Sequence, residues 1–198
     1  MRTSTIACGL WALLMYAGPA AAEEVALPAL TAEKADLEQL GEEFKDEQIR
    51  FRPPKDLQRV KVELKPELMK LGFYSYAWTP EGIHPSIEVI NITCAPPIRG
   101  TRETIDDAVA GLHDSLQRGF EGLALGKVRK GALRGTEVRV GDFKGALNGQ
   151  KVFAVYLMGL DAEGLFSLTA SLPEERATEQ RVRLLQAALL TFERAKPE

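Results

Sequence analysis

Histidine and cysteine are scarce in this chain of 198 residues, which contains two of each. A closed zinc site needs about four such ligands, so the composition argues against a Cys/His metal cage, and two cysteines exclude a disulfide scaffold. A glycine-rich phosphate loop is also missing, because no glycine cluster precedes Lys-Ser or Lys-Thr at the head of a helix. We therefore expect no metal site and no cofactor.

Two common hydrolase signatures are absent as well: a serine between glycines at nucleophile-elbow spacing, and a His-Glu-x-x-His pair. His84 precedes Pro85 in a turn, and His113 lies beside Asp114 on a predicted helix; both patterns are typical of solvated or boundary histidines. We therefore expect no enzyme. The alternative that stays open is an exported hydrolase in which His84 or His113 joins an acid in an assembled site.

The N-terminus has the features of a signal peptide. Arg2 precedes an uncharged stretch, residues 3–22, whose apolar centre is residues 10–16 and whose last three residues are alanines. We expect cleavage after Ala22 and export to the periplasm or the exterior. The stretch is also long enough for an uncleaved anchor, which would then be the protein's contact with a membrane.

Removal of residues 1–22 would leave Cys94 as the single cysteine. An oxidising destination must tolerate that thiol, and burial is the simplest way to do so. Because Cys94 follows the apolar run 87–92, we expect it to be buried. An exposed, reactive thiol is the alternative.

Residues 23–50 differ from the rest of the chain in charge. They carry nine acids and three bases, whereas residues 51–198 carry 19 acids and 21 bases. This asymmetry predicts an acidic arm or helix over 23–50 and a single α+β domain over 51–198. Leu37, Leu40 and Phe44 have helical spacing and allow a docking helix over 31–49; a solvated spacer is the simpler interpretation.

Alternating and β-branched runs predict two groups of strands. The first comprises residues 60–64, 73–78 and 86–93, and the second comprises 128–133, 136–140, 151–160 and 165–171. Asn148 and Gly149 form a hairpin signal. The run 152–158 is apolar at nearly every position, as expected of a central strand that is covered on both faces.

Each group of strands is followed by a predicted helix. The first follows Thr104 and ends near Phe120, and the second opens at Pro173 and continues to Phe192, each with one apolar stripe. The order of strands, helix, strands, helix favours an α+β fold with a central antiparallel β-sheet flanked by helices.

Two groups of side chains are candidates for binding. Tyr74, Tyr76 and Trp78 alternate along one strand, and their shared face is either a binding surface or core packing under a helix. Lys127, Arg129 and Arg139 belong to a basic stretch, residues 127–151, with seven bases and two acids. That stretch is either a contact surface for an acidic partner or the solvent-exposed face of antiparallel strands. The net charge of −3 predicts no contact with nucleic acid.

The element order resembles the PsbP-like domain, a fold shared by the extrinsic photosystem subunit, a nuclear Ran-binding protein and exported bacterial proteins of the DcrB type. The resemblance covers about residues 51–195. It rests on the entry 51–54, the strand ending at Trp78, the helix containing Asp106, Asp107 and Ala108, the hairpin through Gly145 and Gly149 into 152–160, and the terminal helix.

The resemblance implies an α/β/α sandwich and a binding or accessory role without catalysis, but it carries over no functional residue. We therefore expect an exported, non-catalytic accessory or binding protein whose partner is an envelope protein or a small ligand. A small-ligand carrier lined by Tyr74, Tyr76 and Trp78 is a further hypothesis within that class.

Overall fold

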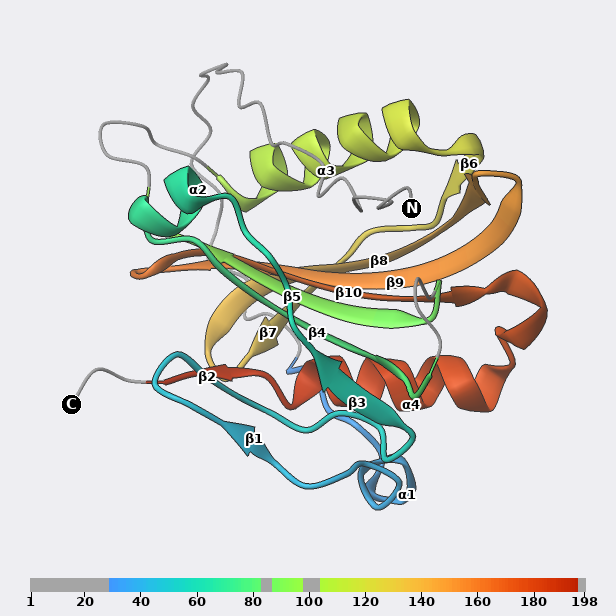
Figure 1. Ribbon diagram of the computed structural model, residues 1–198, viewed down its shortest axis with the longest axis horizontal. Helices are drawn as coiled ribbons and strands as arrows, with labels where there is room; N and C mark the ends of the chain where they lie inside the picture. The colour runs from blue at the N-terminus through green and yellow to red at the C-terminus, as the bar shows by residue number, and fades with distance from the viewer. Residues whose placement is uncertain (1–28, 83–86, 98–103, 196–198) are drawn as a thin grey trace.

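The computed structural model describes residues 29–82, 87–97 and 104–195. A sheet of eight antiparallel strands lies between helix α3 on one face and helix α4 on the other (Figure 1). The strand order is β3-β4-β5-β10-β9-β8-β6, and β7 also pairs with β8. This is the α+β fold that the order of strands and helices predicted.

The first half of the chain supplies one end of the sheet. It consists of β3 (Leu57–Val60), β4 (Tyr74–Pro80) and β5 (Val89–Ala95), with the short helix α2 (Pro66–Lys70) between β3 and β4. The predicted strand over 60–64 is wrong except at Val60, where β3 ends. Val62 and Leu64 alternate with charged residues, but both are only half-buried, so nothing in the core fixes them as a strand.

The second half supplies the other strands: β6 (Glu121–Leu125), β7 (Arg129–Leu133), β8 (Thr136–Leu147), β9 (Gln150–Asp161) and β10 (Gly164–Pro173). Asn148 and Gly149 have φ angles of 51° and 77°, the left-handed conformation that a tight hairpin turn requires. β9 lies between β8 and β10, and every residue from Ala154 to Gly159 is buried. The strand is therefore covered on both faces, as the apolar run predicted.

Helix α3 (Ile105–Gly119) covers one face of β8 and β9. The Thr104 side chain accepts a hydrogen bond from the Asp107 backbone N–H, and the Asp107 carboxylate accepts one from the Thr104 N–H, so the first turn is capped in both directions. Ala108, Val109 and Leu116 of the helix pack in one cluster with strand side chains that include Phe143 and Tyr156.

Helix α4 (Glu179–Leu190) covers the opposite face and begins later than the sequence predicted. β10 continues to Pro173, a single 3-10 turn η1 (Glu174–Arg176) follows, and the Thr178 side chain then caps α4 by accepting from the Arg181 N–H. The acids after Pro173 resemble a helix start, but the true N-cap is the residue whose side chain reaches a free backbone donor.

The described part of the acidic segment, residues 29–50 and hereafter the N-terminal arm, is not a spacer. It contains helix α1 (Lys34–Leu37) and strand β1 (Phe44–Lys45), and strand β2 (Ile49–Phe51) crosses the expected boundary at residue 51. β2 pairs with β11 (Glu193–Arg194) near the other end of the chain.

Core packing explains this correction. Leu40 and Ile49 are 2% and 0% exposed within the main hydrophobic cluster, and the predicted helix over 31–49 is limited to α1. Long-range packing therefore overrides the helical spacing of the arm. The predicted signal peptide, residues 1–22, lies outside the described residues, and no helix within the described ranges is long and apolar enough to span a membrane.

Replacing Ile49 with alanine tests whether the arm is part of the core. We expect Ile49→Ala to lower the free energy of unfolding by about 2–5 kcal/mol, because it removes buried methyl groups and leaves a cavity. Glu47→Ala, an exposed change two residues away, should stay within about 0.5 kcal/mol. Urea unfolding followed by circular dichroism measures both, and equal stability of the two variants would contradict a packed arm.

Candidate functional site: a hollow between helix α4 and the sheet

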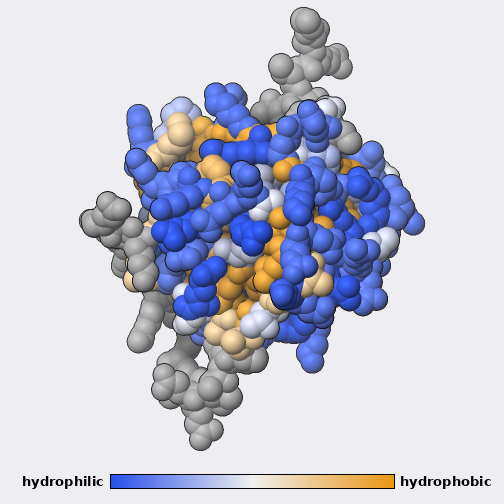
Figure 2. Space-filling model, turned by 90° about the horizontal axis from the view of Figure 1, so that it is seen from below, coloured by the Kyte–Doolittle hydropathy of each residue, from blue (hydrophilic) through white to orange (hydrophobic). Residues whose placement is uncertain are grey.

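A hollow of about 160 Å³ opens between helix α4, strand β7 and the start of the N-terminal arm. We call it the α4 hollow. Its apolar walls come from the arm, the sheet and the helix, and comprise Leu30, Val140, Val155, Leu157, Leu189 and Leu190. Figure 2 shows the molecule from the α4 side, where hydrophobic atoms are visible between hydrophilic side chains near the centre of the face.

The arm forms one wall because it pairs with the outer edge of β7. The Leu30 N–H donates to the Ala132 carbonyl over 3.0 Å, and Ala29 bridges Ala132 in parallel. A Cβ at Gly131 would overlap the Leu30 side chain, so the missing side chain at this position lets Leu30 lie flat against the strand. The basic strand and the apolar arm therefore meet at this edge of the hollow.

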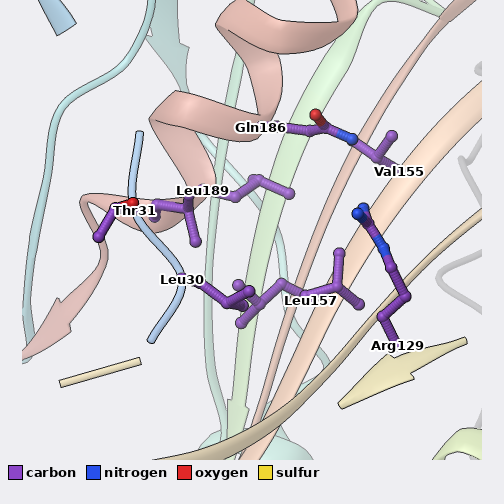
Figure 3. Close-up of a pocket in the computed structure, with 9 residues that line it drawn as sticks. Leu30, Thr31, Arg129, Val155, Leu157, Gln186 and Leu189 are labelled. Carbon is purple, nitrogen blue, oxygen red and sulfur yellow. The ribbon is translucent and has the colours of Figure 1, made fainter. Parts of the chain in front are cut away.

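Three polar side chains line the same space: Thr31 of the arm, Arg129 of β7 and Gln186 of α4. In Figure 3 the Arg129 side chain extends from β7 toward Gln186 and Val155, while Leu30, Leu157 and Leu189 lie around the apolar part. The hollow thus combines an apolar body with a guanidinium and an amide, and its lining contains no acidic residue.

Arg129 differs from most other bases of the stretch 127–151. Four of them contact carboxylates: Lys130 and Arg139 contact Asp106, Arg134 contacts Glu193, and Lys144 contacts Glu174. Within the described ranges Arg129 forms no ion pair, and neither does Lys127 or Lys151. Of these three, Arg129 alone lines the α4 hollow.

Arg139 is on the opposite face of the sheet and has a structural role there. Its side chain is 3% exposed, its Nε donates to Asp106 over 2.7 Å, and its Nη1 donates to Glu137 over 2.6 Å. Burial opposes its charge, but the two carboxylates raise the pKa of Arg139, while the hydrogen bond from Arg139 lowers the pKa of Asp106. The expectation of a binding role for Arg139 is therefore corrected: its guanidinium ties α3 to β8.

The aromatic strand forms core rather than an open surface. Trp78 is 2% exposed, and its ring centroid lies 4.7 Å from that of Phe51 and 5.6 Å from that of Phe44. The Tyr76 hydroxyl donates to Asp46 over 2.7 Å. Of the two interpretations of Tyr74, Tyr76 and Trp78, core packing fits the structure, because the N-terminal arm covers Tyr76 and Trp78.

Tyr74 of β4 and Cys94 of β5 are register partners on neighbouring strands. Cys94 is buried as predicted, and burial raises the pKa of its thiol to about 11. Burial also raises the pKa of the half-buried Tyr74 hydroxyl, and the neighbouring Cys94 adds to the rise. A thiol that stays protonated at neutral pH is a weak nucleophile, so Cys94 fits a packing role.

His113 contacts a tyrosine on the sheet. Its Nε2 lies 2.9 Å from the Tyr156 hydroxyl, and burial lowers the pKa of the imidazole. Within the described ranges Tyr156 is the hydrogen-bond partner of the imidazole, and the charge of the neighbouring Asp114 only partly offsets the lowering of its pKa by burial. His84, the other histidine of the hydrolase alternative, lies outside the described residues. No group of three or more acidic, histidine or cysteine side chains in those ranges is placed to hold a metal ion.

The sequence pointed to Arg129 but not to its neighbours in the site. Tyr74, Tyr76 and Trp78 are not brought to the hollow, and Lys127 is exposed near β7 without lining it. Gln186 carried a signal that was available: it is a lone amide in the apolar helical run 184–190. Leu30 and Thr31 had no such signal, because their pairing with β7 is a long-range contact.

Neither a family model nor a curated protein matches the sequence. Among solved structures, cyanobacterial PsbP from Synechocystis sp. PCC 6803 is similar over 89% of this chain and 98% of its own length, with 12% identity and a TM-score of 0.54. A Pseudomonas aeruginosa protein of unknown function, described as a putative regulator, is similar over 72% of this chain and 99% of its own length, with 11% identity and a TM-score of 0.47. The Saccharomyces cerevisiae Ran-binding protein Mog1p is similar over 73% of this chain and 89% of its own length, with 12% identity and a TM-score of 0.45.

The similarity to cyanobacterial PsbP defines the class of the fold. The helices on both faces of the antiparallel sheet and the similarity to PsbP show that the chain has a PsbP-like fold, as the resemblance in the sequence implied. At this level of identity the likeness concerns the fold alone.

Replacing Arg139 with methionine tests its structural role. We expect Arg139→Met to raise the pKa of Asp106 toward its ordinary value of 3.8 and to cost about 1–2 kcal/mol of stability, less than a fully buried pair because both carboxylates are partly exposed. Since the depressed pKa of Asp106 stabilises the fold above about pH 4, that contribution disappears in acid and should be absent from the variant.

Carboxyl NMR titration and urea unfolding measure the two effects. Lys130→Met is the matched control, because Lys130 also contacts Asp106 but is 61% exposed at 3.9 Å. An Asp106 pKa that responds equally to both variants would contradict the assignment.

Proposed function

We propose that this protein is an exported, non-catalytic binding protein that takes a small ligand in the α4 hollow. The observation that carries the proposal is the contrast among the bases of residues 127–151. Four of them contact carboxylates, whereas Arg129 extends into an apolar hollow without an ion pair in the described part of the chain. A charge held beside apolar walls is the arrangement expected of a small-molecule site.

The side chains that could perform chemistry support a binding role rather than a hydrolytic one. The Cys94 thiol is buried and keeps its proton, and the His113 ring contacts the Tyr156 hydroxyl on the other face of the sheet from the hollow. The resemblance to PsbP-like domains also supports an accessory or binding role. Export rests on the features of residues 1–22.

Export predicts a defined N-terminus. In the envelope fraction of a bacterial host, we expect the protein to begin at Glu23, because Ala20, Ala21 and Ala22 suit a signal peptidase. Intact-mass spectrometry measures this directly. Ala22→Leu, which places a large side chain before the cleavage point, should leave a heavier product, and a wild-type chain that remains in the cytoplasm with residues 1–22 attached would contradict export.

Binding in the α4 hollow predicts thermal stabilisation by ligands that depends on Arg129. In a screen of small metabolites, a true ligand at ten times its dissociation constant should raise the melting midpoint by about 3 °C or more, because it binds the folded state. Arg129→Gln should abolish the shift for that ligand, and Lys127→Gln should keep it. Stabilisation that is the same in both variants would place the ligand elsewhere, and a screen without any hit would count against the binding function.

A further inference from the structure

We infer that the α4 hollow binds small monocarboxylates whose apolar body is about the size of a benzene ring or a six-carbon chain. This inference names the ligand class of the proposed binding function and rests on it. It follows from the volume of the hollow, the chemistry of its walls and the position of its one charged side chain.

The volume limits the ligand's apolar part. A cavity of about 150 Å³ lined by apolar side chains holds one benzene molecule. The α4 hollow measures about 160 Å³, and six aliphatic side chains form its walls. A ring or a short acyl chain fits that space, whereas a long lipid chain or a sugar does not match its size or its walls.

The charges favour an anion with one negative group. Arg129 is the single charged residue of the lining, and the Gln186 amide is a second donor across the same opening. A guanidinium can hold a carboxylate through two parallel hydrogen bonds, and the amide N–H₂ could add a third. The lining offers no second cation for another anionic group.

The described neighbours leave Arg129 available for this contact. The next residue, Lys130, points to the other face of the sheet and contacts Asp106 there. The nearest base in the chain that has a carboxylate partner on the α4 side is Arg134, which contacts Glu193 at 3.1 Å. No acid of the lining competes with a bound carboxylate.

Hexanoate tests the inference directly. In NMR titrations of the full chain, we expect hexanoate to shift signals of Arg129, Leu157 and Leu189, and 1-hexanol and hexylamine to bind more weakly. Arg129→Gln should raise the dissociation constant for hexanoate about tenfold, as expected for loss of hydrogen bonds to a charged group. Lys127→Gln removes the same charge from a position outside the lining and should change it less than about twofold.

A second variant tests the apolar part. Leu190→Trp enlarges a half-buried wall residue and should abolish the hexanoate shifts, with circular dichroism as the check on folding. If that variant does not fold, the comparison of Arg129→Gln with Lys127→Gln still decides the question.

Two results would overturn the inference: equal affinity of Arg129→Gln and the wild type for hexanoate, or hexanoate-induced shifts confined to another surface. If hexanoate fails while a metabolite of another class gives an Arg129-dependent thermal shift, the ligand class is wrong and the binding function stands; failure of both rejects both.

Discussion

The central sheet has two covered faces, and neighbouring residues of a strand must therefore satisfy opposite environments. In β9, Val155 and Leu157 pack in the cluster beneath α4, while Ala154, Tyr156 and Met158 pack beneath α3. Because side chains alternate with a period of two, a shift of one residue would exchange the two faces. The register of β8, β9 and β10 thus decides the core and the site together.

Glycines keep this register where large rings cross a neighbouring strand. A Cβ at Gly141 would overlap the Tyr156 ring, and a Cβ at Gly159 would overlap the Phe166 ring. Each glycine is the register partner of the ring that it accommodates. These positions therefore matter for close packing, and the Tyr156 hydroxyl can reach His113 on α3 because Gly141 leaves its path open.

The same alternation sorts the basic residues. Lys130 and Arg139 are register partners on the α3 face, where both contact Asp106. Arg129 is the register partner of Val140 on the α4 face, where the two line the hollow. Adjacent bases in the sequence therefore have different roles, and counting bases could not separate a structural arginine from one that is open to a ligand.

Local patterns predicted the parts of the fold that local forces determine. The alternation and the hairpin signal located β4, β5, β7, β9, β10 and the first part of β8, and the cap at Thr104 located α3, because each depends on residues close in sequence. The rest of β8, to Leu147, and the whole of β6 were not predicted. The failures involve contacts between distant residues. Nothing near Ile49 in the sequence indicates that it pairs with Arg194. Leu40 and Ile49 stand among acidic residues, so the local composition does not indicate their burial, which depends on strands far along the chain.

The site shows the same division. Arg129 could be named from the charge of its stretch, but its availability could not, since that depends on which carboxylates the folded chain brings to Lys130, Arg134 and Arg139. The tyrosines and Trp78 were named for their polar handles and large area. Those properties serve packing equally well, and the arm that covers Tyr76 and Trp78 was itself expected to be a spacer.

The N-terminal arm links the core to the hollow. Its inner part buries Leu40 and Ile49, and its outer part places Leu30 and Thr31 against β7 as one wall of the hollow. A ligand that packs on Leu30 binds only the chain in which this outer part is paired with Ala132, so occupancy and pairing are thermodynamically linked. A ligand bound there would therefore stabilise the edge of the sheet as well as the site, because the same short segment forms both.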